Sequence, residues 1–114
     1  MSASVSRSGD RGHHRMAATV FVVARFRALE GQDEALKQAL LKMVPPTRRE
    51  PGCIQYDLLQ SPEDPRDLCF LERWESDRAL QQHIQGEGLQ RMLGDARAFI
   101  DGTPHGARYT MVFA

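Results

Sequence analysis

Four polar or aromatic residues fall on predicted faces that are otherwise apolar: Tyr56, Glu72, Trp74 and His83. His83 follows Ala79 by four residues and Leu80 by three, so the three side chains share one face of a helix. A neutral imidazole turned toward a sheet in this way can accept or donate a proton near physiological pH. The alternative for His83 is a core residue with a satisfied hydrogen bond.

The alternation of apolar residues around Glu72 directs its carboxylate toward apolar surroundings. A buried carboxylate must be paired or protonated, and an ion pair with an arginine or with a partner subunit would satisfy it. Trp74 and Tyr56 are either core aromatics or walls on which a flat ligand stacks. A ligand site with His83 as proton acceptor and Trp74, Tyr56 and Glu72 around it is therefore one hypothesis.

Other kinds of catalytic site have no motif in this chain. There is no phosphate loop, CxxC pair, HExxH helix or GxSxG elbow, so nucleotide, zinc and serine-hydrolase chemistry are not indicated. His13 and His14 are adjacent, but no further ligand accompanies them at a fixed geometry. We expect no metal site.

The elements of the first half begin with TVFVVARFR from Thr19, whose Val and Phe content predicts a strand. After Gly31, apolar residues recur at helical spacing and predict a one-faced helix: Leu36, Ala39, Leu40, Met43 and Val44. Pro45 and Pro46 interrupt this helix, and residues 47–50 can form a second short turn before Pro51 and Gly52 end it.

The second half begins with two strands, CIQYDLLQ and DLCFLERWE, joined by the turn-rich SPEDPR. Ile54, Tyr56 and Leu58 are expected on one face of the first, and a turn near Glu63 and Asp64 places Cys53 opposite Trp74 and Cys69 opposite about Leu58. Ser76 is the expected N-cap of the helix that carries His83. A further helix is predicted from Leu89 to Ile100, and ARYTMVF, residues 107–113, forms a last strand.

This order predicts an α+β fold, the ferredoxin-like βαββαβ arrangement with a four-stranded antiparallel sheet and helices on one face. Apolar residues point to both faces of several strands, including residues 20–23. We therefore expect a second copy of the chain to cover the other face, giving a homodimer.

Length and charge narrow the classes of protein further. The chain has 114 residues, enough for one domain, and 15 basic against 15 acidic side chains, so nucleic acid is not an expected partner. No apolar run is long enough to span a membrane. With two cysteines expected as free thiols, we predict a cytoplasmic protein. Residues 1–16 are predicted to be a disordered tail, and residues 17–114 the folded domain.

Three motifs at their observed spacing resemble the antibiotic biosynthesis monooxygenase family, including its quinol monooxygenase branch: EPGCIQYDL, FLERWES and RALQQHIQ. The resemblance covers residues 17–114 and implies a dimeric α/β barrel. It also implies oxidation of a quinol or polycyclic phenol by dioxygen without a prosthetic group, so no cofactor is expected. The family's recurrent Trp and His correspond to Trp74 and His83.

Two positions depart from the family pattern. Gly88 stands where a second histidine often follows, and Ala24 stands where the haem-degrading relatives have an asparagine in the first strand. The expected function is a cofactor-independent monooxygenase acting on a small hydrophobic aromatic substrate and dioxygen. The alternatives are a non-catalytic module that binds a small hydrophobic ligand and a haem-degrading oxygenase or other enzyme on the same fold.

Overall fold

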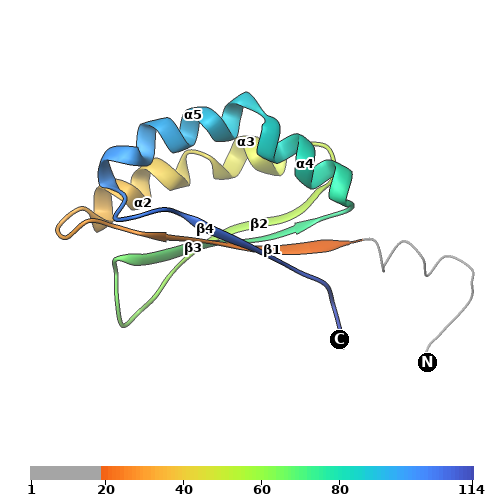
Figure 1. Cartoon of the computed structure of the whole chain (residues 1–114), viewed down its shortest axis with the longest axis horizontal. Coiled ribbons are helices and arrows are strands. Elements are labelled where there is room, and N and C mark those ends of the chain that lie inside the picture. Colours follow the sequence, from red (N-terminus) through yellow and green to blue (C-terminus); the bar gives the residue numbers. More distant parts are fainter. Residues whose placement is uncertain (1–18) are drawn as a thin grey trace, which may run out of the picture.

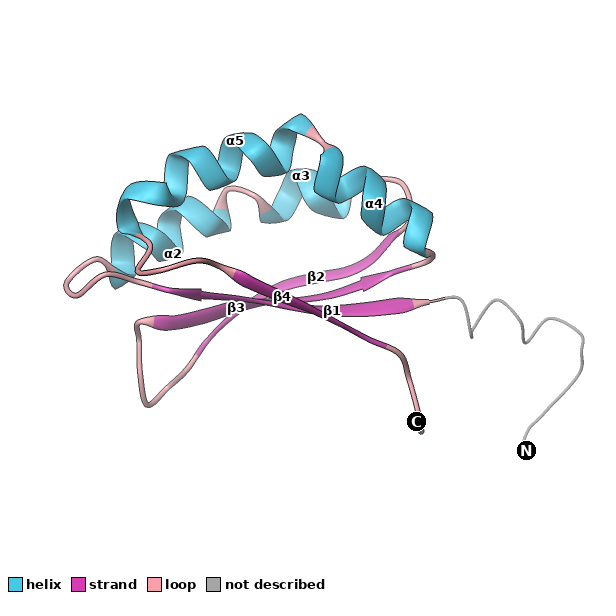
Figure 2. Ribbon diagram, in the orientation of Figure 1, coloured by secondary structure: helices cyan, strands magenta, loops and turns pink. Residues whose placement is uncertain are grey.

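The computed structural model describes residues 19–114, in which four strands form one antiparallel sheet with order β2-β3-β1-β4. All helices lie on one face of this sheet (Figures 1 and 2). The ferredoxin-like α+β fold expected from the sequence is confirmed. In chain order the elements are β1 Val20–Arg27, α2 Asp33–Leu41, α3 Val44–Arg48, β2 Cys53–Gln60, β3 Asp67–Trp74, α4 Asp77–Gln85, α5 Glu87–Ala96, a 3₁₀ turn Arg97–Phe99 and β4 His105–Tyr109.

In strand β3 every second side chain is buried, as expected for a strand with one face on the core. Leu68, Phe70, Glu72 and Trp74 are buried under the helices, and the residues between them are half-buried on the opposite face. Strand β1 lies beside β3 with Val22 opposite Glu72 and Ala24 opposite Phe70. The centre of the sheet therefore presents a carboxyl group toward the helices, as the alternation predicts.

The helices follow the start and stop signals of the sequence. Pro45 and Pro46 occupy the first turn of α3, so the predicted interruption separates α2 from a short second helix. Arg48 holds α3 over β2, because its Nε donates to the Tyr56 carbonyl at 3.0 Å and its guanidinium pairs with Asp57 at 2.8 Å. Ser76 caps α4, accepting the Ala79 N–H at 3.1 Å, as predicted.

Gly52 connects α3 to β2 at a point where α4 passes very close. Its φ is +82°, and a Cβ placed there would lie 2.4 Å from the Ala79 Cβ. Its carbonyl also accepts the Glu75 N–H at 2.8 Å, which joins the start of β2 to the end of β3. Only glycine allows this turn and this approach together, so Gly52 sets the distance between α4 and the sheet.

A β-bulge between Cys53 and Gln55 changes the predicted alternation of β2. Tyr56 is buried as expected, but Ile54 is 51% exposed, so the prediction that the two share a face is wrong. Cys53 does lie opposite Trp74, whereas Cys69 lies opposite Leu59 instead of Leu58. Both thiols are free and half-buried, and burial raises their pKa values.

The last two predicted elements have different bounds in the structure. The helix that begins at Glu87 ends at Ala96, and Ile100 forms a β-bridge with Ala28 instead of continuing the helix. The last strand is β4, His105–Tyr109, and the predicted residues 110–113 lie outside it with their apolar side chains exposed. The predicted tail, residues 1–16, lies outside the described residues.

The face of the sheet opposite the helices carries several apolar side chains, including Phe21, Val23, Leu71 and the exposed Leu59 and Tyr109. No helix within residues 19–114 covers it (Figure 2). Nor is any helix of this part of the chain long and apolar enough to cross a membrane.

Candidate active site

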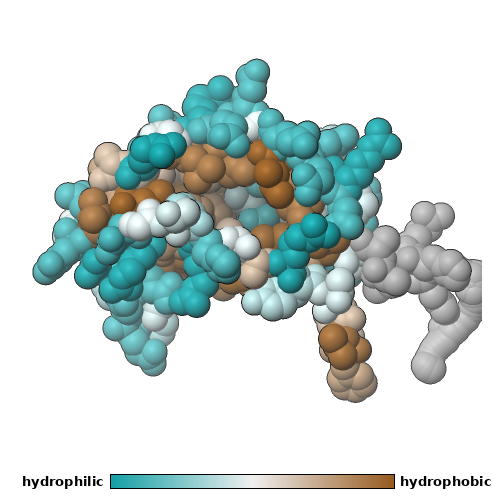
Figure 3. Space-filling view, viewed as in Figure 1, coloured by the Kyte–Doolittle hydropathy of each residue, from teal (hydrophilic) through white to brown (hydrophobic). Residues whose placement is uncertain are grey.

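A cavity of about 250 Å³ lies between the sheet and helices α4 and α5. Its walls are mostly apolar, and it opens between these helices and the edge strand β4, where Figure 3 shows an apolar hollow. Strands β1 and β3 supply the floor with Val22, Ala24 and Phe70. Tyr56, Glu72 and His83 also line the cavity, so the structure brings together three of the four residues singled out in the sequence. Few polar groups in a mostly apolar cavity are typical of small-molecule sites.

Glu72 is a buried carboxyl group whose hydrogen-bond partner is an indole. Its Oε1 accepts the N–H of Trp74 at 2.8 Å, and its side chain is only 4% exposed. Burial raises the pKa of Glu72 to about 7 and the charge of Glu50 adds to this rise, while the bond from Trp74 opposes it. The expected ion pair with an arginine is absent among the described residues, and Glu72 can titrate near neutral pH instead.

His83 projects from α4 between two aromatic rings and a carboxylate. Its Nδ1 is 2.9 Å from Oε1 of Glu50, in the turn after α3, and its ring lies 4.7 Å from that of Trp74 at 31°. The ring of Tyr56 approaches His83 edge-on at 5.6 Å. Because Nδ1 is hydrogen-bonded to Glu50, Nε2 is the ring nitrogen available to a molecule in the cavity.

Tyr56 stacks on Phe70 with ring centroids 4.5 Å apart. Burial raises the pKa of its phenol, and the neighbouring charge of Glu72 raises it further. The buried Thr47 hydroxyl has no hydrogen bond of good geometry among residues 19–114, although it lies close enough to Tyr56 to lower this pKa slightly. Tyr56 therefore remains a neutral phenol and is suited to lining the site, not to accepting a proton.

Trp74 does not line the cavity, in contrast to the contact with substrate expected from the sequence. Trp74 is fully buried behind Glu72 and His83, which do line the cavity. Its N–H bonds to Glu72, and its ring lies against His83. Glu50 was missed as a site residue, although it begins the EPGC motif. Its 33-residue separation from His83 gives no local pattern, so the fold is needed to pair them.

Of the two positions that depart from the family pattern, Ala24 lines this cavity and Gly88 does not. Ala24 presents only a methyl group to the cavity, so no side-chain hydrogen bond is available there. A Cβ on Gly88 would lie 3.4 Å from the Met43 methyl group, in ordinary contact. No cluster of three or more potential metal ligands occurs within residues 19–114, and His13 and His14 fall outside this range.

The sequence profile described as antibiotic biosynthesis monooxygenase matches residues 19–94, which include Glu50, Tyr56, Glu72, Trp74 and His83 but not β4. The chain belongs to the antibiotic biosynthesis monooxygenase family. A curated relative from Mycobacterium tuberculosis, named putative monooxygenase Rv0793, is 41% identical over 68 residues. That alignment spans 60% of this chain and 66% of the relative, just under two thirds of its length.

Solved structures show the same fold in other members of this family and in proteins of similar shape. Protein SO0527 from Shewanella oneidensis is 32% identical, with a TM-score of 0.76 over 82% of this chain and 90% of its own. SnoaB from Streptomyces nogalater, described as a cofactor-independent oxygenase, has a TM-score of 0.75 over 86% of this chain and 97% of its own. At 18% identity, SnoaB supports the fold alone.

Proposed function

We propose that this chain is a monooxygenase that oxidises a small quinol or phenol with dioxygen and needs no prosthetic group. The observation that carries the proposal is a buried histidine and a carboxyl group of raised pKa on one apolar cavity. Membership of the antibiotic biosynthesis monooxygenase family supports it.

The chemistry requires little of the protein because the substrate supplies the electrons. Nε2 of His83 accepts the hydroxyl proton of the quinol, and the resulting anion transfers an electron to dioxygen in the mostly apolar cavity. One oxygen atom then enters the ring, and the other leaves as water with two hydrogens from the substrate. The protonated carboxyl group of Glu72 also faces the cavity, where it can donate a hydrogen bond to an oxyanion that develops on the substrate.

The size of the cavity indicates which quinols fit. About 250 Å³ is slightly below the roughly 300–1,000 Å³ common for ligand pockets. The proposed substrate is therefore a quinol of one or two rings, and a larger polycyclic phenol would protrude past β4. Arg108 at the mouth, paired with Asp77, would meet any such protruding group.

We propose further that a second copy of the chain covers the open face of the sheet. The face carries the apolar side chains of Phe21, Val23 and Leu71, and toward one end of it Arg73 lies over the Phe21 ring at 5.0 Å. The Arg73 Nε is buried without an acceptor among the described residues, and a second copy would supply one. A homodimer of this kind has one cavity in each subunit.

The deciding experiment for the activity is oxygen uptake by the purified protein with reduced menadione and with one-ring quinols. Uptake above the rate of spontaneous oxidation, with product carrying one oxygen atom from ¹⁸O₂, is the expected result. Saturable quinol binding without uptake would instead indicate a ligand-binding module. A Soret shift on addition of haem, with haem breakdown and no quinol oxidation, would indicate the haem-degrading alternative.

A further inference from the structure

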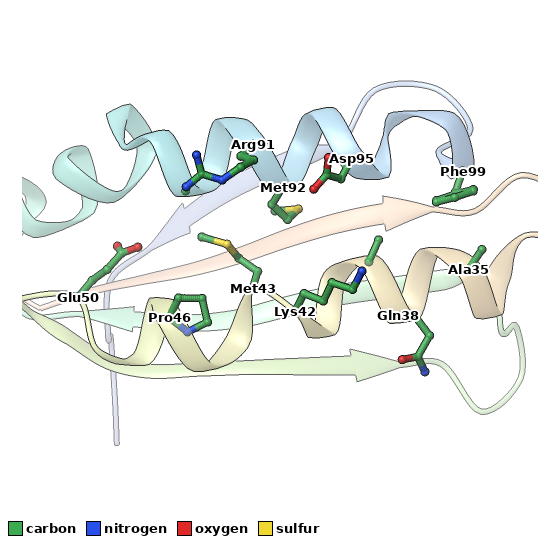
Figure 4. Close-up of a pocket in the computed structure, with 12 residues that line it drawn as sticks. Ala35, Gln38, Lys42, Met43, Pro46, Glu50, Arg91, Met92, Asp95 and Phe99 are labelled. Atoms are coloured by element: carbon green, nitrogen blue, oxygen red, sulfur yellow. The ribbon is translucent and has the colours of Figure 1, made fainter.

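A second hollow of about 470 Å³ lies on the outer side of the helices, between α2 and α3 on one side and α5 on the other (Figure 4). Apolar residues form part of its lining, and charged and polar side chains form the rest: Gln38, Lys42, Glu50, Arg91 and Asp95. Unlike the inner cavity, this outer groove is therefore suited to holding water. Glu50 lies at one end of it (Figure 4).

Two methionines separate the outer groove from the inner cavity. Met92 of α5 lines both spaces and is 5% exposed, and Met43, in the turn between α2 and α3, faces it across the groove (Figure 4). Within residues 19–114, the bond between His83 and Glu50 is the one side-chain hydrogen bond that joins a residue of the inner cavity to a residue of the outer groove. The wall is apolar except at this pair.

The hydrogen bond also determines which nitrogen of His83 can act as a base. An ionised carboxylate only accepts hydrogen bonds, so an ionised Glu50 requires the proton of the neutral ring to be on Nδ1. Nε2 then has a free lone pair directed toward the inner cavity. The carboxylate also stabilises the imidazolium that forms when Nε2 takes a proton, as a triad carboxylate does for its histidine.

We infer that Glu50 is a positioning residue for His83 and a proton outlet that connects the apolar inner cavity to water in the outer groove. This inference rests on the proposed function. The O–H bond of the quinol breaks as the N–H bond at Nε2 forms, and the Nδ1 proton moves to the Glu50 carboxylate. Glu50 releases that proton to water, which leaves a neutral ring protonated on Nε2. Nε2 then gives its proton to the oxygen atom that leaves as water, and Nδ1 takes a proton back from water through Glu50. The cycle thus restores the starting ring and delivers one of the two protons of the product water, and the substrate supplies the other directly.

Other charged and titratable groups face this pair from each neighbouring element. Glu72, Tyr56 and Cys53 lie on the inner side, and the charge of Glu50 acts on all three. Lys42, Arg91 and Asp95 line the outer groove with Glu50. Asp95 is a useful matched control, because it is an exposed carboxylate of the same groove and does not contact His83.

The first test needs no turnover. Long-range ¹H–¹⁵N spectra of protein labelled in histidine, with the His83 signals assigned by their loss in His83→Gln, show which ring nitrogen carries the proton. Wild type and Asp95→Asn are expected to have the proton on Nδ1, and Glu50→Ala to move it mostly to Nε2. A wild-type ring protonated on Nε2, or an unchanged ring in Glu50→Ala, would overturn the inference.

The second test separates positioning from structure by kinetics. We expect Glu50→Gln to lower kcat for quinol oxidation by roughly 10- to 100-fold with little change in KM, because the amide keeps a hydrogen bond but not the charge. Glu50→Asp should recover part of this loss, and Asp95→Asn should behave as wild type. Equal kcat in Glu50→Gln and wild type would refute the proton outlet. A wild type without uptake would contradict the proposed function, and the ¹⁵N spectra would still decide the role of Glu50.

Discussion

The indole N–H of Trp74 donates to the carboxyl group of Glu72, two residues earlier on the same strand, across 2.8 Å. Side chains two apart in a strand share a face, so β3 provides both partners without help from another element. The same tryptophan ring lies against His83. Trp74 therefore contacts both Glu72 and His83 of the cavity while it remains outside the cavity itself.

We expect Glu72→Gln to remove a pH dependence from the stability of the fold. The carboxyl titrates near pH 7 in the folded chain and near about 4.3 when unfolded, so the folded state binds the extra proton between these values. The contribution of Glu72 to stability is thus greatest below the unfolded pKa of about 4.3. The free energy of unfolding falls by up to about 3 kcal/mol as the pH rises from there through the folded pKa of about 7. Urea unfolding across this range measures the slope. Glu63→Gln, in an exposed loop, should keep it, and an equal slope in Glu72→Gln would contradict the assignment.

Trp74→Phe should make the same pH dependence steeper. The variant loses the N–H that stabilises ionised Glu72, so the pKa of Glu72 rises further. A hydrogen bond to a charged group is worth about 1.5–3 kcal/mol. We therefore expect the loss in free energy of unfolding to be larger by this amount where Glu72 is ionised, at alkaline pH, than where it is protonated, at acidic pH. The double variant Glu72→Gln/Trp74→Phe is the control, because its loss should not depend on pH. A loss that is the same at every pH in the single variant would show that Trp74 acts by packing alone.

His83→Ala should separate folding from activity. We expect a folded protein whose quinol-dependent oxygen uptake falls by about 10²-fold or more, the usual effect of losing a general base. If His83 is instead only a core residue, the variant should lose about 1–3 kcal/mol of stability and keep its activity per folded molecule. Uptake and thermal melting on the same preparations distinguish the two, and an active but destabilised variant would refute the catalytic role.

Gly52→Ala and Gly31→Ala form a matched pair that tests the close approach of α4. Both glycines have φ near +80°, but a Cβ at Gly31 meets nothing within 4 Å. We expect the strained backbone to cost about 1 kcal/mol in each, and the clash with Ala79 to cost Gly52→Ala about 1–3 kcal/mol more. Chemical denaturation gives both values. Equal losses would mean that α4 shifts away from Gly52 at no cost.

Sedimentation tests the proposed dimer. Wild type at micromolar concentration is expected at twice the 12.9 kDa of the chain, and Leu71→Asp, in the middle of the open face, is expected as a monomer. Leu41→Asp makes the same change on an exposed position of α2, away from that face, and should stay dimeric. A wild type that sediments only as a single chain would exclude this interface.

Local patterns in the sequence predict most of the fold. The presence of β1, the break at Pro45 and the Ser76 cap each depend on a few adjacent residues, and the structure confirms them, with β1 beginning at Val20 instead of Thr19. The β-bulge at Ile54 and the early end of β4 have no such local signal. Ile54 and the apolar residues 110–113 follow a pattern typical of strands, but pairing with neighbouring strands decides where a strand bends or ends.

The candidate site was predictable one residue at a time but not as an arrangement. Alternation places Glu72 on the core face, and helical spacing places His83 there. Neither pattern shows that Trp74 would reach Glu72 instead of the cavity, or that a turn 33 residues away would bring Glu50 to His83. Contacts of this kind depend on side-chain packing between distant segments.

The order of strands in the sheet also determines when the chain can fold. Strand β1 is synthesised first, but its partners are β3 and β4, and β4 is completed only at Tyr109. During translation the apolar residues 20–23 have no partner until β3 is complete at Trp74, and the edge of β1 that pairs with β4 stays open until Tyr109. An unpaired apolar strand is a site of aggregation. Nascent chains that stall before β4 should thus depend on chaperones more than the completed protein does.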